Sequence, residues 1–324
     1  MSNNNEKIKK QPDAVLVPVP AQDGAAVIKH EDPVLKAKMH ALKYNRIITR
    51  AILYFMLTMG ALVVLFPLVW MILTAMKQPG TAFKFAFIPE SLSYEGFSKL
   101  YTLENFKKVF AEFNFMKYFF NSIIVASLAA VFATTFACMA GYVFAKKNFI
   151  YKDLIFYMLV ATMMIPGMMY LVPQFVITVK LGWFDTYQGL IIPHLANIFG
   201  VFMMRQFMRS IPDSLIEAAK LDGASEWQVF TIIIVPMAMP IIVTLFLLTF
   251  LFHWSNFIWQ LVITKPGSAI LTIPVGLAYF SGPHGSEWEL MMAASCFSII
   301  PMAILFLVAQ NFFIEGMTKG AVKE

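Results

Sequence analysis

Six long apolar stretches constrain this chain more than any other feature of its sequence. Each has about 20 residues or more, which is enough for a helix to cross a bilayer. Because a chain in lipid must satisfy its own backbone hydrogen bonds, we expect each stretch to be helical. With 59% hydrophobic and 14% charged residues, the chain is too apolar for an ordinary soluble surface. The approximate bounds of the stretches are 50–75, 117–145, 154–178, 187–208, 237–263 and 289–313.

The sequence therefore predicts an all-α polytopic membrane protein with three segments. Residues 1–31 are polar and interrupted by prolines, so we expect a disordered cytoplasmic tail. Residues 32–49 alternate basic with apolar side chains, which is typical of an amphipathic helix at the membrane interface. A solvated helix face would explain the same alternation. Residues 50–324 form the expected transmembrane domain.

Lysine and arginine predict how these stretches are oriented. If the amino terminus lies inside, 17 of the 25 basic residues fall in inner segments and 8 in outer ones. The positive-inside rule then places both termini in the cytoplasm, together with the loop between the fourth and fifth stretches. The outer loops 76–116 and 264–288 either contact an extracytoplasmic partner or only connect the spans.

The inner loop 211–236 is patterned as helix, glycine break and helix. Gly223 stands where the first helix must end, and glycine takes the left-handed cap conformation at little cost. Ser225 and Gln228 have the spacing of a capping box, so a second helix is expected to begin there. Pro236 opposes a simple continuation of that helix, although a kink is allowed.

The first helix of this loop carries a small, smooth face. Leu215, Ala218 and Ala219 share that face, with Glu217 beside them. Either the loop lies on the membrane as an amphipathic hairpin, or this helix docks in a groove of another protein. Two starts are possible for it: Ser214 could form a capping box with Glu217, or Ser210 could be the cap with Pro212 in the first turn. We favour the second.

The loop also resembles a known signature. It reads Glu217-Ala218-Ala219, three residues, Gly223, nine residues, then Ile233-Ile234-Val235-Pro236, where Val235 stands in the usual place of leucine. This is similar to the EAA loop of the membrane subunits of binding-protein-dependent ABC importers. Asn121-Ser122, Gly141–Lys146 and Gly320–Lys323 look like features of the carbohydrate-uptake branch, and within it of the six-span, maltose-type partner.

The resemblance implies a permease subunit of a bacterial inner-membrane importer that moves a sugar or oligosaccharide into the cytoplasm. Its implied partners are a second permease subunit, two ATP-binding subunits and an extracytoplasmic solute-binding protein. The chain lacks a Gly-x-x-x-x-Gly-Lys-Ser/Thr loop, so we expect ATP and Mg²⁺ on the partner ATPase and no enzyme activity or cofactor here. The residues implied to couple the chain to the ATPase are Leu215, Glu217, Ala218, Ala219, Asp222 and Gly223.

Polar side chains inside the apolar stretches suggest where a sugar could pass, because such groups are costly in lipid and often functional. Amides can pair with sugar hydroxyls, and aromatic rings can cover sugar C–H surfaces. The alternative is hydrogen bonding between helices, with tryptophans at the membrane interface. His253, Asn256 and Gln260 have the i, i+3, i+7 spacing of one helix face. The candidate set is Tyr170, Gln174, Asn197, His253, Trp254, Asn256, Trp259 and Gln260.

Other classes of membrane protein remain as alternatives. A permease for a non-sugar solute would carry the same loop. An ion-gradient-driven secondary transporter would be expected to have internal repeats and buried carboxylates, but the middle of each stretch lacks acidic residues. A membrane enzyme is the third alternative; His194 and His253 are isolated and lack the spacing of metal ligands, so no metal site is expected.

Overall fold

A computed structural model describes residues 33–84, 94–282 and 285–321. The chain divides into two compact units, residues 1–63 and 64–324, and each is described by itself. Helix α1 (Pro33–Ala75) begins in the first unit and ends in the second. It includes residues of the predicted interfacial segment 32–49 and continues without a break into the first predicted span. The predicted tail, residues 1–31, lies outside the described residues.

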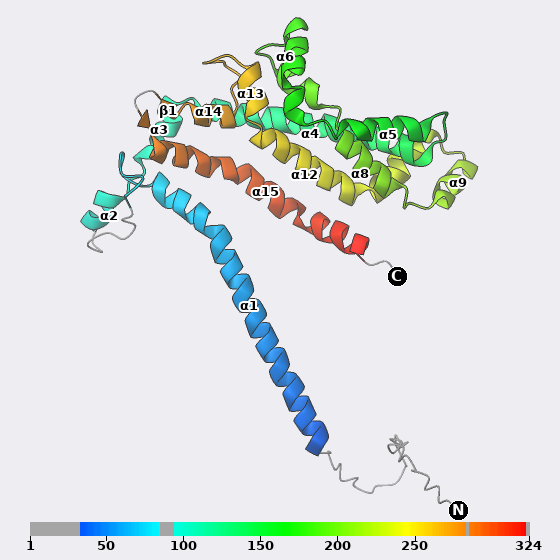
Figure 1. Cartoon of the computed structure of the whole chain (residues 1–324), viewed down its shortest axis with the longest axis horizontal. Coiled ribbons are helices and arrows are strands. Elements are labelled where there is room, and N and C mark those ends of the chain that lie inside the picture. The colour runs from blue at the N-terminus through cyan, green and yellow to red at the C-terminus, as the bar shows by residue number, and fades with distance from the viewer. Residues whose placement is uncertain (1–32, 85–93, 283–284, 322–324) are drawn as a thin grey trace, which may run out of the picture. The chain divides into compact units, whose positions relative to one another are not determined.

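The second unit is almost entirely helical (Figure 1). Its elements after α1 are α2 (Tyr94–Leu100), α3 (Glu104–Glu112), α4 (Phe115–Lys146), α5 (Lys152–Thr162), η1 (Gly167–Met169), α6 (Leu171–Lys180), α7 (Tyr187–Ile191), η2 (Ile192–His194), α8 (Ile198–Met208), α9 (Asp213–Leu221), α10 (Glu226–Gln228), η3 (Val229–Ile234), α11 (Val235–Met237), α12 (Met239–Ser255), α13 (Ile258–Ile263), α14 (Ile273–Ala278), β1 (Ser281–Gly282), β2 (Gly285–Ser286) and α15 (Trp288–Ala321). The two short strands pair antiparallel.

Helix α4 is the central element of this unit, and it packs most extensively against α8 and α12 (Figure 1). The middle of its buried face is rich in alanines, which allow neighbouring helices to approach closely. A Cβ added to Gly200 on α8 would lie 2.9 Å from the Cβ of Ala137 on α4. The close packing of these three helices therefore depends on small side chains. The buried alanines of α4 are Ala126, Ala129, Ala130, Ala133 and Ala137.

Three described helical segments are individually long and apolar enough to cross a membrane: Arg46–Ala75, Phe115–Lys146 and Trp288–Gln310. Two further crossings arise if each of two bent helix pairs counts as one span: Tyr187–His194 with Ile198–Met208, and Glu226–Met237 with Met239–Ser255. The described helices thus supply up to five crossings by length and composition, and the six-span topology remains a prediction.

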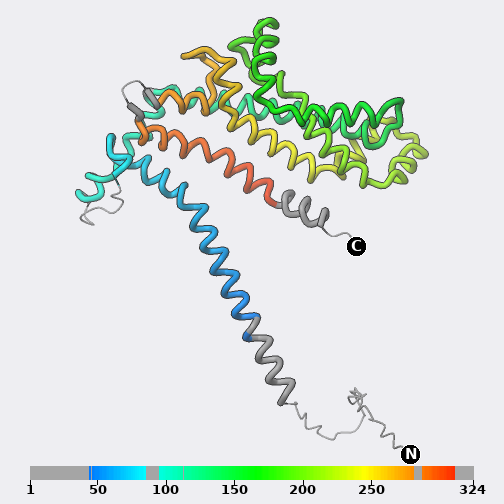
Figure 2. The backbone as a smooth tube through the Cα atoms, viewed as in Figure 1, coloured from blue at the N-terminus to red at the C-terminus, as the bar shows by residue number. Residues whose placement is uncertain are grey.

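The third predicted span, residues 154–178, is not one helix. Helix α5 ends at Thr162, a turn and the short η1 follow, and α6 begins at Leu171 in a different direction (Figure 2). Pro166 is extended at the break, with φ −58° and ψ 131°. Proline lacks the backbone N–H that an unbroken helix needs, so the helix breaks at Pro166. Hydropathy counts apolar residues and does not register this missing donor, so the prediction of one continuous helix was wrong.

The fifth predicted span, residues 237–263, is also divided. Helix α12 ends at Ser255, because Asn256 is extended with φ −70° and ψ 112°. The Asn256 side chain accepts a hydrogen bond from the backbone N–H of Trp259 at 3.3 Å. This side-chain bond replaces a helical one and lets α13 begin after a turn. The expectation that His253, Asn256 and Gln260 share one continuous helix face is therefore wrong.

Candidate functional site

The inner loop begins with helix α9, whose start differs from the prediction. Pro212 is extended, so α9 begins at Asp213 and Pro212 lies outside its first turn. The Ser210 hydroxyl does not cap α9; it donates to the Phe207 carbonyl at 2.7 Å. Ser214 lies within α9, and no side-chain hydrogen bond caps its start. The preference for a Ser210 cap was wrong because the preceding turn already takes that hydroxyl.

The end of α9 has the predicted geometry. Gly223 has φ +83°, which places it in the left-handed region. Its N–H donates to the Lys220 carbonyl at 3.0 Å, and the Ala224 N–H donates to the Ala219 carbonyl at 2.9 Å. The predicted capping box follows, since Ser225 and Gln228 each accept a hydrogen bond from the other's backbone N–H. Local signals in the sequence thus predicted this turn correctly.

Helix α9 is held by one buried side chain and exposes most of the others. Ile216 is buried and packs with the core cluster that includes Val229 and Ile234. Leu215, Glu217 and Ala218 are exposed, and Ala219 is half-buried. Leu221 is 89% exposed. An exposed leucine beside small residues and a carboxylate forms a surface suited to a partner groove.

Ion pairs join this loop to the last turn of α4. Lys146 Nζ lies 2.7 Å from Asp213 Oδ1 at the start of α9, and it also donates to the Ile211 carbonyl. Lys147 pairs with Glu226, and Lys220 Nζ lies 2.9 Å from the other oxygen of that carboxylate. The hydrogen bond and charge of Lys146 hold the pKa of the exposed Asp213 carboxyl below its usual value.

Arg205 makes a second polar connection at the same end of α4. Its guanidinium lies 2.9 Å from Asp153 Oδ1 on α5, and its Nε donates to the Phe144 carbonyl on α4 at 3.3 Å. The group also lies 3.8 Å from the centroid of the Phe156 ring, within cation–π range. Because the arginine side chain is buried, these partners compensate for its lost hydration.

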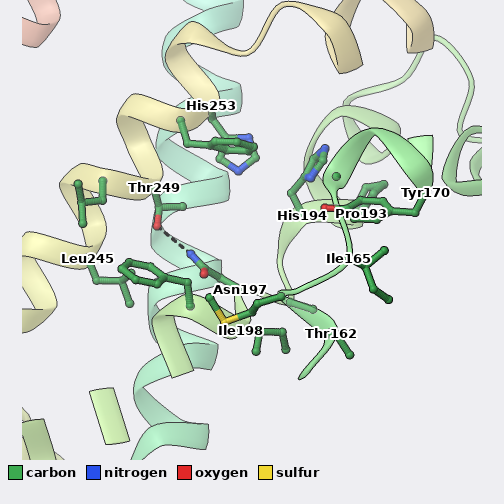
Figure 3. Close-up of a pocket in the computed structure, with 16 residues that line it drawn as sticks. Thr162, Ile165, Tyr170, Pro193, His194, Asn197, Ile198, Leu245, Thr249 and His253 are labelled. Atoms are coloured by element: carbon green, nitrogen blue, oxygen red, sulfur yellow. Dashed lines mark hydrogen bonds between the residues drawn. The ribbon is translucent and has the colours of Figure 1, made fainter. Parts of the chain in front are cut away.

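The candidate substrate residues surround two adjoining cavities of about 670 and about 630 Å³. Gly167, Tyr170, His194 and Phe252 line both. In the larger cavity Asn197 donates to Thr249 Oγ1 at 3.2 Å, with His253 nearby and Tyr170 and His194 opposite (Figure 3). The candidates that line one or both cavities are Tyr170, Gln174, Asn197, His253, Asn256 and Trp259.

Trp254 and Gln260 are not among the lining residues of either cavity. The Trp254 indole donates to the Ser298 carbonyl on α15 at 3.1 Å. Gln260 is buried; its amide donates to the His253 carbonyl at 2.9 Å and accepts from Thr272. These two side chains therefore make the contacts of the alternative interpretation, hydrogen bonding between helices.

Sequence reasoning missed the charged residues that hold the loop. Lys147 was counted only for orientation, Lys146 was counted for orientation and as the end of the Gly141–Lys146 resemblance, and Asp213 and Glu226 were not singled out. The paired residues are 67 and 79 positions apart, and no spacing rule relates them. The Ser-x-x-Gln pattern that contains Glu226 predicted the capping box but gave no sign of an ion pair.

The chain has several apolar helices long enough to cross a bilayer. It also has an exposed loop that ion pairs hold to the end of α4. These features define a polytopic membrane component. The chain belongs to the family of binding-protein-dependent transport system inner membrane components, which residues 133–319 match. It is therefore an inner-membrane transport component with several crossings, and not an enzyme.

Two relatives align with most of the chain. The arabinooligosaccharides transport system permease protein AraQ of Bacillus subtilis is 30% identical over 275 residues, 84% of this chain and 94% of that protein. The trehalose/maltose transport system permease protein MalG of Thermococcus litoralis is 32% identical over 285 residues, 86% of this chain and 99% of that protein.

One solved structure has a similar fold. A chain of a bacterial ABC transporter involved in the import of the acidic polysaccharide alginate aligns with a TM-score of 0.69 at 21% identity. The alignment covers 82% of this chain and 96% of that one. At this identity the likeness concerns the fold alone.

Proposed function

We propose that this chain is a permease subunit of an ATP-driven importer that moves a sugar or oligosaccharide into the cytoplasm. The family supports import that depends on a binding protein, and the names of two relatives, which are permeases for arabinooligosaccharides and for trehalose or maltose, support a sugar as the transported solute. Its partners would be a second permease subunit, two ATP-binding subunits and an extracytoplasmic solute-binding protein. ATP and Mg²⁺ would bind on the ATPase, and both termini would lie in the cytoplasm.

Helix α9 is proposed as the docking element for the ATPase. The observation that carries this is an exposed helix whose first turn pairs with Lys146 of α4 and whose last turn is held through Glu226, which also pairs with Lys147. A short helix transmits force only if its ends are held. Glu217 would pair with a basic group of the ATPase, while Leu215, Ala218 and Ala219 would fit its groove. Asp222 and Gly223 end the helix and shape the turn.

The test is purification of the tagged chain from its native membrane, followed by mass spectrometry and an ATPase assay. We expect an ATPase and a second permease to copurify with the wild-type chain, and Glu217→Lys to lose the ATPase. Lys180→Glu, a charge reversal at the exposed end of α6, is the matched control and should retain it. A chain that purifies alone and moves solute into vesicles without ATP would instead be driven by an ion gradient.

The two cavities are proposed as part of the substrate path. Tyr170 and Asn256 present a phenol and an amide, and Trp259 adds an aromatic surface; these groups suit a sugar. Asn256→Ala should weaken solute affinity in the complete importer, while Thr135→Ala on the exposed face of α4 should not. Gln260→Ala is expected to act mainly through stability. Unchanged affinity and uptake in Asn256→Ala would exclude this path. High-affinity uptake of a non-sugar solute would support the proposed importer function but contradict the proposal that the solute is a sugar.

A further inference from the structure

Five charged side chains meet where α9 and α10 face the end of α4. Asp213 and Lys220 come from the first and last turns of α9, and Glu226 begins α10. They pair with two consecutive residues at the carboxyl end of α4: Lys146, the last residue of the helix, pairs with Asp213, and Lys147, the extended cap residue that follows it, pairs with Glu226. Lys220 shares the Glu226 carboxylate. We call these five residues the loop clamp. The first turn of the candidate docking helix is thereby tied directly to α4, and its last turn is tied to the cap of α4 through Glu226.

The Glu226 carboxylate is the shared point of the loop clamp. Besides the two lysines, it accepts a hydrogen bond from the Tyr142 hydroxyl at 3.2 Å. Lys147 also lies over the Tyr142 ring, 5.1 Å from its centroid. The Tyr142 ring in turn packs against Phe230, at 5.2 Å between centroids. Three elements, α4, α9 and the α10–η3 segment, thus converge on a single side chain.

The backbone on either side of α9 is irregular. On the amino-terminal side, the extended Pro212 separates α9 from α8. On the other side the chain forms a π-helix at Val229–Ile234, a turn at Ala238, and a bend of 78° before α12. A π-helical segment interrupts the regular hydrogen-bond ladder and is frequent at functional sites. The route along the chain from α9 to α12 thus runs through irregular backbone.

Helix α4, in contrast, is uninterrupted from Phe115 to Lys146. Its 32 residues extend over roughly 48 Å at the rise of an α-helix. Near its other end Asn121 donates to the Ala269 and Leu271 carbonyls, in the loop predicted to lie outside. A displacement at the loop clamp can thus reach the opposite end of the unit through one rigid element.

We propose that the loop clamp makes α9 and α4 move as one body, so that α4, which is distant from the loop in sequence, carries the ATPase movement across the membrane. This inference rests on the proposed docking of the ATPase on α9. It assigns Glu226 and Lys147 as positioning residues for coupling, in addition to the residues of the docking surface.

The first test uses the complete importer in liposomes, with uptake and ATP hydrolysis measured together. Glu226→Lys and Lys147→Glu should each retain the copurifying ATPase but lower uptake per ATP about fivefold, the size expected for contacting charged groups. The double variant restores opposite charges and should recover most of the coupling. The matched control, Lys107→Glu in the exposed Lys107–Glu104 pair of α3, should leave the ratio unchanged. Normal uptake per ATP in both single variants, or no recovery in the double, would overturn the clamp.

A second test does not depend on breaking the contact. Lys147→Cys and Glu226→Cys, in a chain whose native Cys138 and Cys296 are replaced by alanine, are joined by a short bifunctional thiol reagent. If the inner loop, with α9 and α10, moves together with α4, the joined protein still couples ATP hydrolysis to uptake, and more strongly than the unjoined one. Hydrolysis without uptake after joining would show that the inner loop must move relative to α4, and would overturn the proposal. Glu217→Lys tests the docking of the ATPase separately, because its readout is loss of the copurifying ATPase. Failure of the proposed docking and failure of the loop clamp therefore give different results.

Discussion

The two ends of α4 are held by different kinds of interaction. At the carboxyl end Lys146 and Lys147 pair with Asp213 and Glu226, whose side chains are 75% and 54% exposed. At the amino end the groups are neutral and mostly buried: Asn121 binds two backbone carbonyls and the Tyr187 hydroxyl, and the Ser122 hydroxyl accepts from the Ile273 N–H at 2.8 Å.

This difference sets how easily each end can rearrange. An exposed ion pair contributes about 0–1 kcal/mol, so its partners can separate at small cost. A buried group that loses its hydrogen-bond partner costs about 1–3 kcal/mol, since water does not replace it. The amino end should therefore stay fixed to the 264–288 loop through single contacts. At the carboxyl end each ion pair is weak by itself, and only the loop clamp as a whole, together with the Tyr142 hydrogen bond and the Tyr142–Phe230 contact, holds α4 to the docking loop.

The largest effect on folding is expected from Asn121→Leu. The change removes the donor of two hydrogen bonds and the acceptor of a third, and it leaves the buried Leu271 carbonyl without that partner. We expect a loss of about 3 kcal/mol, measured by thermal unfolding of the purified protein in detergent. Asn148→Leu, at an exposed position two residues beyond the carboxyl end of α4, is the matched control and should change stability by less than about 0.5 kcal/mol. Equal effects would remove the distinction between the ends.

Gly223→Pro should leave the protein folded but abolish transport. Proline cannot adopt the φ of +83°, and it lacks the N–H that donates to the Lys220 carbonyl. A side chain would meet no heavy atom within 4 Å, so conformation and not space is the obstacle. Gly223→Asn should be milder, because asparagine tolerates positive φ. Normal transport by well-inserted Gly223→Pro would show that the turn is not needed for coupling.

The same contrast explains what the sequence could predict. Gly223 and the Ser225–Gln228 capping box depend on neighbours within a few residues, and the pattern itself contains that information. The breaks at Pro166 and Asn256 were missed because apolar content does not distinguish a continuous helix from two shorter ones. Six of the eight proposed path residues line a cavity, but the sequence could not separate them from Trp254 and Gln260, because packing between elements distant in sequence decides which side chains border the cavities.

A smaller effect on stability is expected at the carboxyl end from Lys146→Met. The substitution removes the pair with Asp213 and the bond to the Ile211 carbonyl but keeps an apolar stem of similar length. We expect a loss of about 1 kcal/mol, of which the Asp213 part should shrink at high salt. Thermal unfolding at low and high salt measures both. A loss as large as that of Asn121→Leu would mean that the carboxyl end is as rigidly fixed as the amino end.

The smallest effect concerns pH and the Asp213 carboxyl. Its folded-state pKa lies below the unfolded value because Lys146 bonds and attracts the carboxylate. The pair therefore stabilises the fold fully above the unfolded pKa of about 4, and that contribution is lost as pH falls through the lower, folded pKa. We expect wild-type unfolding measured between pH 7 and pH 3 to show a small extra destabilisation that Asp213→Asn lacks. Because the carboxylate is exposed, salt should reduce this difference. Identical pH profiles would show that the Lys146 pair adds nothing, and would leave Glu226 as the main link between α4 and the loop.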